Sequence, residues 1–129
     1  MLRLIKFFAI ISFLLITACS SEEQAVPLIE ITEELKKEFY DDAAELSYSL
    51  SEGFTKNNSF SDEEIELLDA FLDKYDGVGQ HIDVVLFANI QLISGTNYIY
   101  ESEGRNVVRR EEIRKLLEDL REGTSLKPN

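Results

Sequence analysis

The sequence predicts an all-α fold, a small bundle of three or four helices. In several segments apolar residues recur every three or four positions, the spacing that gathers them on one face of a helix. Residue types that cap helices precede these segments, and glycines follow them. The chain has 129 residues and one cysteine, so it suits a single domain held together by packing rather than by disulfides.

The first helix is expected over residues 33–51. Thr32 is its cap, and two glutamates at its start complement the positive end of the helix dipole. Gly53 is expected to end the helix. Its apolar stripe advances by three or four residues at a time and consists of Leu35, Phe39, Ala43, Leu46 and Leu50.

A capping box predicts the start of the second helix. Ser61 stands at the cap position, and Glu64 follows it by three residues, the spacing at which the two residues cap each other. This helix is expected to run to about Tyr75, where the Asp-Gly-Val-Gly segment at 76–79 ends it.

Residues 80–94 are compatible with either a helix or a strand. Their length of about fifteen favours a helix that ends at Gly95, whereas their β-branched residues favour a strand. The helix is preferred. Because this segment is apolar on most sides, we expect it at the centre of the bundle, where neighbouring helices cover it.

The stretch at 97–108 is ambiguous. Tyr98, Ile99 and Tyr100 are typical of a brief strand and residues 103–106 of a turn, so a short β-hairpin and a loop fit equally well. A final helix is expected over residues 108–122, closed by Gly123 and followed by a disordered tail at 124–129.

The chain begins with the features of an export signal. Arg3 and Lys6 supply positive charge, and the next ten residues, 7–16, are almost entirely apolar. A membrane-spanning helix needs about 20 apolar residues, and this run is shorter because polar residues follow Cys19 directly. We therefore expect a signal peptide that is cleaved.

The end of this signal resembles the lipobox of bacterial lipoproteins. Ile16, Thr17, Ala18 and Cys19 match its aliphatic, small or β-branched, small and cysteine positions in order. The resemblance implies that the Cys19 sulfur forms a thioether to diacylglycerol, that cleavage falls between Ala18 and Cys19, and that the new amino group is acylated. The alternative is an ordinary cleaved signal with a chance cysteine.

This interpretation divides the chain into a signal peptide (1–18), a lipidated cysteine with a flexible tether (19–29), a helical domain (30–123) and the tail. The membrane is then reached through the lipid, with the domain on the periplasmic or extracellular side. Ser20 stands where Asp is the family's mark for inner-membrane retention, so the resemblance favours the outer membrane in a cell with two membranes.

The charge of the exported part argues against nucleic acid as a partner. After residue 18 the chain carries 11 basic and 25 acidic residues, a formal net charge of −14. Binding to nucleic acid depends on Lys and Arg that neutralise phosphates. The acidity is interpreted as a solvated surface.

The sequence lacks the patterns of common catalytic and metal sites. It has a single histidine, His81, and neither a Gly-x-Ser-x-Gly elbow nor a phosphate-binding loop. The glycines at 77 and 79 lack calcium ligands at the required spacing. We therefore expect no enzyme activity, no metal and no cofactor other than the covalent lipid.

The expected function is that of a non-enzymatic protein-binding or accessory module of the cell envelope. It would serve in secretion, assembly, exclusion or immunity, and its partner would be another envelope protein. Tyr98, Tyr100 and Arg105 are the candidate contact residues, because Tyr and Arg are common where proteins bind partners. The favoured interpretation of these tyrosines is nevertheless that they cover the end of the bundle. The alternatives are a structural or stress-related envelope lipoprotein without a client and, least favoured, a small hydrolase with a carboxylate pair.

Overall fold

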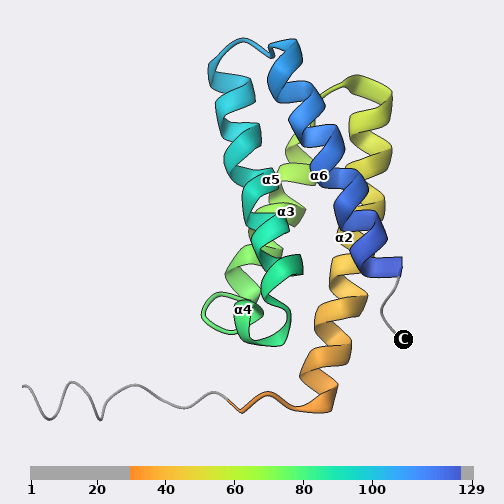
Figure 1. Ribbon diagram of the computed structural model, residues 1–129, viewed down its shortest axis with the longest axis vertical. Helices are drawn as coiled ribbons and strands as arrows, with labels where there is room; N and C mark the ends of the chain where they lie inside the picture. Colours follow the sequence, from red (N-terminus) through yellow and green to blue (C-terminus); the bar gives the residue numbers. More distant parts are fainter. Residues whose placement is uncertain (1–29, 126–129) are drawn as a thin grey trace, which may run out of the picture. The chain divides into compact units, whose positions relative to one another are not determined.

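The computed structural model describes residues 30–125, which form five helices and, within that range, no strand. Four of the helices are long: α2 (Glu33–Asn57), α3 (Asp62–Lys74), α5 (Val84–Ser102) and α6 (Val107–Ser125). The fifth, α4 (Gly79–Ile82), is a single turn (Figure 1). The predicted all-α bundle is confirmed, and the β-hairpin considered for residues 97–108 is wrong.

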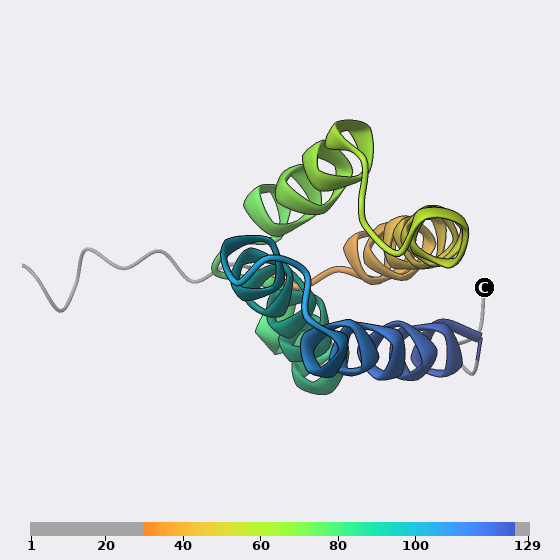
Figure 2. The same cartoon turned by 90° about the horizontal axis from the view of Figure 1, so that it is seen from above.

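The long helices form a closed ring of contacts. Helix α2 packs against α3 and α6, and α5 packs against the same two helices from the other side (Figure 2). Since each helix touches two others, the bundle buries one shared core between them.

Helix α2 begins where the sequence predicts and ends later. The backbone N–H of Leu35 donates to the Thr32 hydroxyl at 3.1 Å, which caps the first turn. The helix continues through Gly53 to Asn57 and ends at Asn58, whose backbone is left-handed with φ 54°. The prediction that Gly53 ends this helix is therefore wrong. A side chain there would overlap the Glu64 carboxylate of α3, so this glycine permits close helix packing.

Helix α3 confirms the predicted capping box. The Ser61 backbone N–H donates to the Glu64 carboxylate at 2.8 Å, and the Glu64 N–H donates to the Ser61 hydroxyl at 3.2 Å. The turn that follows the helix uses Gly77, whose φ of +76° is a conformation that glycine adopts without strain.

The segment predicted as a helix over 80–94 is helical but differs at both ends. Asp83 interrupts it, and its carboxylate caps α5 by accepting the Leu86 N–H at 3.0 Å. Helix α5 then passes Gly95 and continues to Ser102. It includes the Tyr98–Tyr100 stretch because Asn97 and Tyr100 are buried at helical spacing and the Tyr100 hydroxyl donates to the Asn58 carbonyl at 2.7 Å.

Helix α6 is likewise longer than predicted, since it passes Gly123 and reaches Ser125. The turn before it contains Gly104 and Arg105, both with positive φ. Asn106 then accepts the Arg109 N–H at 2.9 Å and so supplies a cap that the sequence interpretation did not include.

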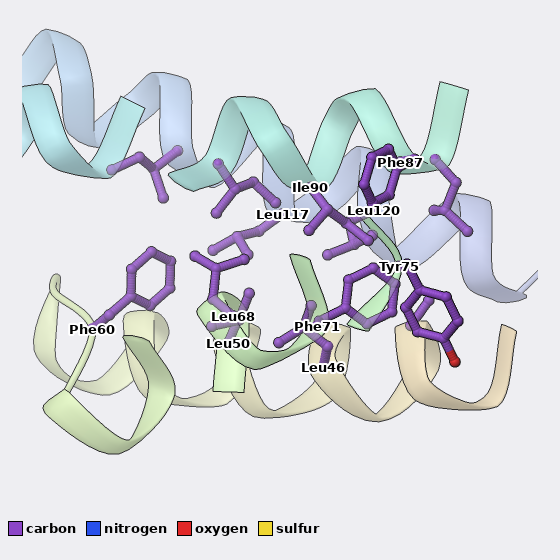
Figure 3. Close-up of a cluster of buried hydrophobic side chains, with 14 of the residues drawn as sticks. Leu46, Leu50, Phe60, Leu68, Phe71, Tyr75, Phe87, Ile90, Leu117 and Leu120 are labelled. Carbon is purple, nitrogen blue, oxygen red and sulfur yellow. The ribbon is translucent and has the colours of Figure 1, made fainter. Parts of the chain in front are cut away.

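The core lies between two pairs of helices. Figure 3 shows Phe87, Ile90, Leu117 and Leu120 of α5 and α6 pointing toward side chains of α2 and α3. All the buried hydrophobic residues of the described part fall between Phe39 and Leu120. Helix α5 belongs to the wall of the bundle, so its expected position at the centre, with most faces covered, is wrong.

Candidate functional site

The residues singled out from the sequence do not form one site. Ala18 and Cys19 lie outside the described residues. Tyr98 is exposed, whereas Tyr100 is buried, because two positions along a helix turn the chain by about 200°. Arg105 is exposed, and its Nε lies 3.1 Å from the Glu101 carboxylate. Of the candidate contact residues, Tyr98 and Arg105 are thus open to a partner, and Tyr100 belongs to the core.

The strongest candidate is the side of α5 that faces away from the core. We call this surface the α5 outer face and define it by Val85, Ala88, Leu92, Gly95, Ile99 and Ser102. Val85 is 77 % exposed and Leu92 57 % exposed, and the space around Gly95 is open. The buried positions of α5 lie on the opposite side and include Leu86, Ile90, Ile93, Asn97 and Tyr100. A helix in a soluble bundle normally places polar residues on its outer side.

The α5 outer face lacks charge in a chain that is rich in it. From Val84 to Tyr100 the helix contains no acidic or basic residue, whereas 38 of the 129 residues of the chain are Asp, Glu, Lys or Arg. A helix that is apolar on all sides is usually covered on all sides. Contiguous exposed apolar surface marks an interaction site more often than an isolated exposed leucine does.

A groove of about 790 Å³ adjoins this face, between α5 and α6. On the α5 side its lining includes Val85, Ala88, Asn89 and Leu92, which are spaced as the four residues around one side-chain hole on a helix. Leu116 lines it from α6. The Asn89 amide donates to the Leu116 carbonyl at 3.2 Å, while its Oδ1 accepts no hydrogen bond from the described residues. The groove is therefore lined mainly by apolar side chains, with Asp83 and Asp119 also in its lining and one unused acceptor on Asn89.

No family model, curated protein or solved structure matches this chain.

The sequence interpretation missed the α5 outer face, although a signal for it was present. Its six members are separated by three, four, three, four and three residues, the spacing of the contact positions in a coiled coil. The same helix also carries the buried stripe, so apolar residues occur on both of its sides. The sequence alone therefore does not show which side the neighbouring helices leave exposed.

A polar cluster joins α2 to α3 elsewhere in the bundle. The hydroxyl of buried Tyr75 donates to the Asp42 carboxylate at 2.6 Å. Lys74 donates to Asp42 and to Glu38, each at 2.7 Å. Burial and the bond to Asp42 raise the pKa of Tyr75. Burial opposes the ionisation of Asp42, but its bonds to Lys74 and Tyr75 outweigh this and lower its pKa. Because Lys74 bridges both carboxylates, the cluster ties the two helices together.

We expect Tyr75→Phe to lower the free energy of unfolding by about 1 kcal/mol, because the ring stays buried while one hydrogen bond is lost. The lowered pKa of Asp42 means that its stabilising charge is present above the ordinary value of 3.8 and is lost as pH falls through the lower folded-state value. The difference between variant and wild type should thus shrink below that pH. Urea unfolding over a pH series measures it, with the exposed Tyr48→Phe as the control.

The described part of the chain offers neither a metal site nor a membrane span. Between residues 30 and 125, no three His, Cys, Asp or Glu side chains gather in a way that could hold a metal ion. In the same range no helix has the length and apolar character to cross a membrane. His81 lies exposed on α4.

Proposed function

We propose that this chain is a lipid-anchored protein of the bacterial cell envelope that acts as a non-enzymatic protein-binding or accessory module. The observation that carries the anchor is the sequence Ile-Thr-Ala-Cys at 16–19, placed at the end of an export signal. The observation that favours binding as the task is the α5 outer face, an exposed apolar helix side in an otherwise highly charged chain.

The lipid explains how an acidic domain is held at a membrane. A protein with a net charge of −14 after residue 18 is repelled by anionic head groups, so electrostatic attraction does not hold it there. Each buried methylene contributes about 0.8 kcal/mol, and a single acyl chain binds only reversibly. A diacylglyceryl group with an N-acyl chain supplies three chains and anchors the protein stably.

The mass of the N-terminal peptide tests the anchor. In wild type we expect a peptide that begins at Cys19 and carries diacylglyceryl and acyl groups. Cys19→Ser should accumulate as a precursor that retains residues 1–18 and has no acyl mass, while the neighbouring Ser21→Ala should match wild type. A wild-type chain cleaved at another bond, or cleaved at Cys19 without acyl groups, would contradict the proposal.

A second measurement tests the destination. If residues 1–19 are replaced by an ordinary cleavable signal, the remaining chain should be released in soluble form. In a cell with two membranes, Ser20→Asp should move the acylated protein from the outer to the inner membrane. Fractionation of the two membranes measures the change, and an unchanged distribution would contradict the outer-membrane assignment.

A further inference from the structure

The α5 outer face alternates large and small residues. Val85, Leu92 and Ile99 are separated by seven residues; Ala88 and Gly95 lie between them, and Ser102 follows Ile99. Contact positions that repeat every seven residues let two helices stay in contact along their length. The neighbouring helices of this bundle use the other side of α5, so the outer face is available to a helix from another molecule.

We infer that this face binds the same face of a second copy of the chain, with the two α5 helices antiparallel and a two-fold axis passing between Ile93 and Ser94. The inference deepens the proposed function by naming the partner. It rests on that function only in taking the α5 outer face as the binding surface, and it does not require the lipid.

The pattern is self-complementary in one orientation. In the antiparallel arrangement Leu92 lies opposite Gly95 of the second copy, Ala88 opposite Ile99, and Val85 opposite Ser102. Each layer then holds one large and one small side chain. A parallel arrangement would place Leu92 on Leu92 and Gly95 on Gly95, which leaves a gap in alternate layers. Close packing therefore favours the antiparallel dimer.

The groove beside α5 supplies the matching hole. Ile99 of the second copy lies over Ala88 in this arrangement, and the residues around Ala88 that line the groove are Val85, Asn89 and Leu92. A side chain enters a hole of four such residues in coiled-coil packing. The two-fold axis provides the hole twice, once on each copy.

The absence of charge on the α5 outer face disfavours a basic partner. After residue 18 the chain carries a formal net charge of −14, so two copies repel each other overall. A partner selected by electrostatic attraction would be basic and would bind an acidic surface. The α5 outer face has no charge to attract such a partner, whereas its alternation of large and small residues matches the same face of a second copy.

The size of the face predicts a weak dimer. A helix of 19 residues is about 28 Å long and about 10 Å wide. Stable interfaces bury about 1,200–2,000 Å² in total, and a face of this size on each copy lies below that range, where weak and transient contacts are found. We expect dissociation constants in the micromolar range in solution. Attachment to one membrane would raise the local concentration and favour the dimer.

Sedimentation equilibrium of residues 20–129 tests the association, since the described core lies wholly between Phe39 and Leu120 and does not include the removed part. The wild-type mass should rise toward twice the chain mass with concentration. Leu92→Glu should raise the dissociation constant more than tenfold, because it buries charge at the two-fold axis. The matched control is Leu67→Glu on α3, which is 49 % exposed and should leave association unchanged. Circular dichroism checks that both variants fold.

Cysteine cross-linking tests the orientation, because the only cysteine of the chain is Cys19 and residues 20–129 have none. A mixture of Val85→Cys and Ser102→Cys chains should form mixed disulfide dimers. Neither variant alone should form a disulfide dimer, because in the antiparallel arrangement identical positions lie about 26 Å apart along the helix. A disulfide dimer of Val85→Cys alone would overturn the antiparallel arrangement.

A chain that stays monomeric at all concentrations, or a dimer equally weakened by Leu67→Glu, would overturn self-association. A photo-reactive residue at position 92 of the acylated protein in membranes should capture a second copy. Capture of a different protein there would overturn the second copy as occupant and leave the proposed function standing. Absence of acyl groups would overturn the proposed anchor and leave the dimer standing.

Discussion

Replacing Phe39 with alanine is expected to lower the free energy of unfolding by about 3–5 kcal/mol, the usual cost of removing a buried phenylalanine ring. Phe39 is fully buried on α2. Its ring centroid lies 5.5 Å from that of Phe71 and 5.0 Å from that of Tyr75, in an edge-on arrangement with Tyr75. Such ring pairs add to the energy of burial. Alanine would leave a cavity where α2 meets α3.

Thermal and urea unfolding measure this effect. For a domain of this size the change corresponds to a fall in Tm of about 15 °C or more. The control is Tyr48→Ala on the same helix, where the side chain is 70 % exposed and removal should change stability by no more than about 0.5 kcal/mol. Equal effects of the two substitutions would show that α2 does not present Phe39 to the core.

The features that the sequence predicts well are local. The capping box at Ser61 and Glu64 and the cap at Thr32 each depend on residues three positions apart, and the structure contains both. Such contacts form wherever the helix begins, so neighbouring sequence is enough to predict them.

The glycines show where local reasoning fails. Gly53, Gly95 and Gly123 were predicted to end helices, and the helices pass through all three. Tertiary packing decides these positions, because a buried helix face keeps the chain helical through one unfavourable residue. Gly77 and Gly104 have positive φ and lie where the sequence predicts a helix end at 76–79 and a turn at 103–106.

Helix α5 shows the same limit for the candidate site. Tyr98, Ile99 and Tyr100 favour a strand by composition, yet the burial of Tyr100 and its bond to the Asn58 carbonyl keep them helical. The exposed Val85 and Leu92 are as apolar as the buried residues beside them. They are exposed because α3 and α6 pack against the other side of α5. The sequence of α5 alone does not predict that packing.

A methyl group at Gly79 is expected to destabilise the protein by about 1–3 kcal/mol, the cost of adding atoms to a filled core. Gly79 is buried at the start of α4. A Cβ there would lie 2.4 Å from Cδ2 of Phe87, and that ring is itself buried. Gly79→Ala must therefore displace either the ring or the turn that places α4 against α5.

The turn itself offers the matched comparison. Gly77→Ala should also destabilise the protein, but through its φ of +76°, since no atom lies near its Cβ position. The two causes separate in a Phe87→Leu background, where the smaller side chain leaves room at position 79. Gly79→Ala should cost less there than in wild type, and Gly77→Ala should cost the same in both, as measured by urea unfolding of the double-mutant cycles. Equal costs for Gly79→Ala in the two backgrounds would contradict the contact with Phe87, and with it the packing of α4 on α5.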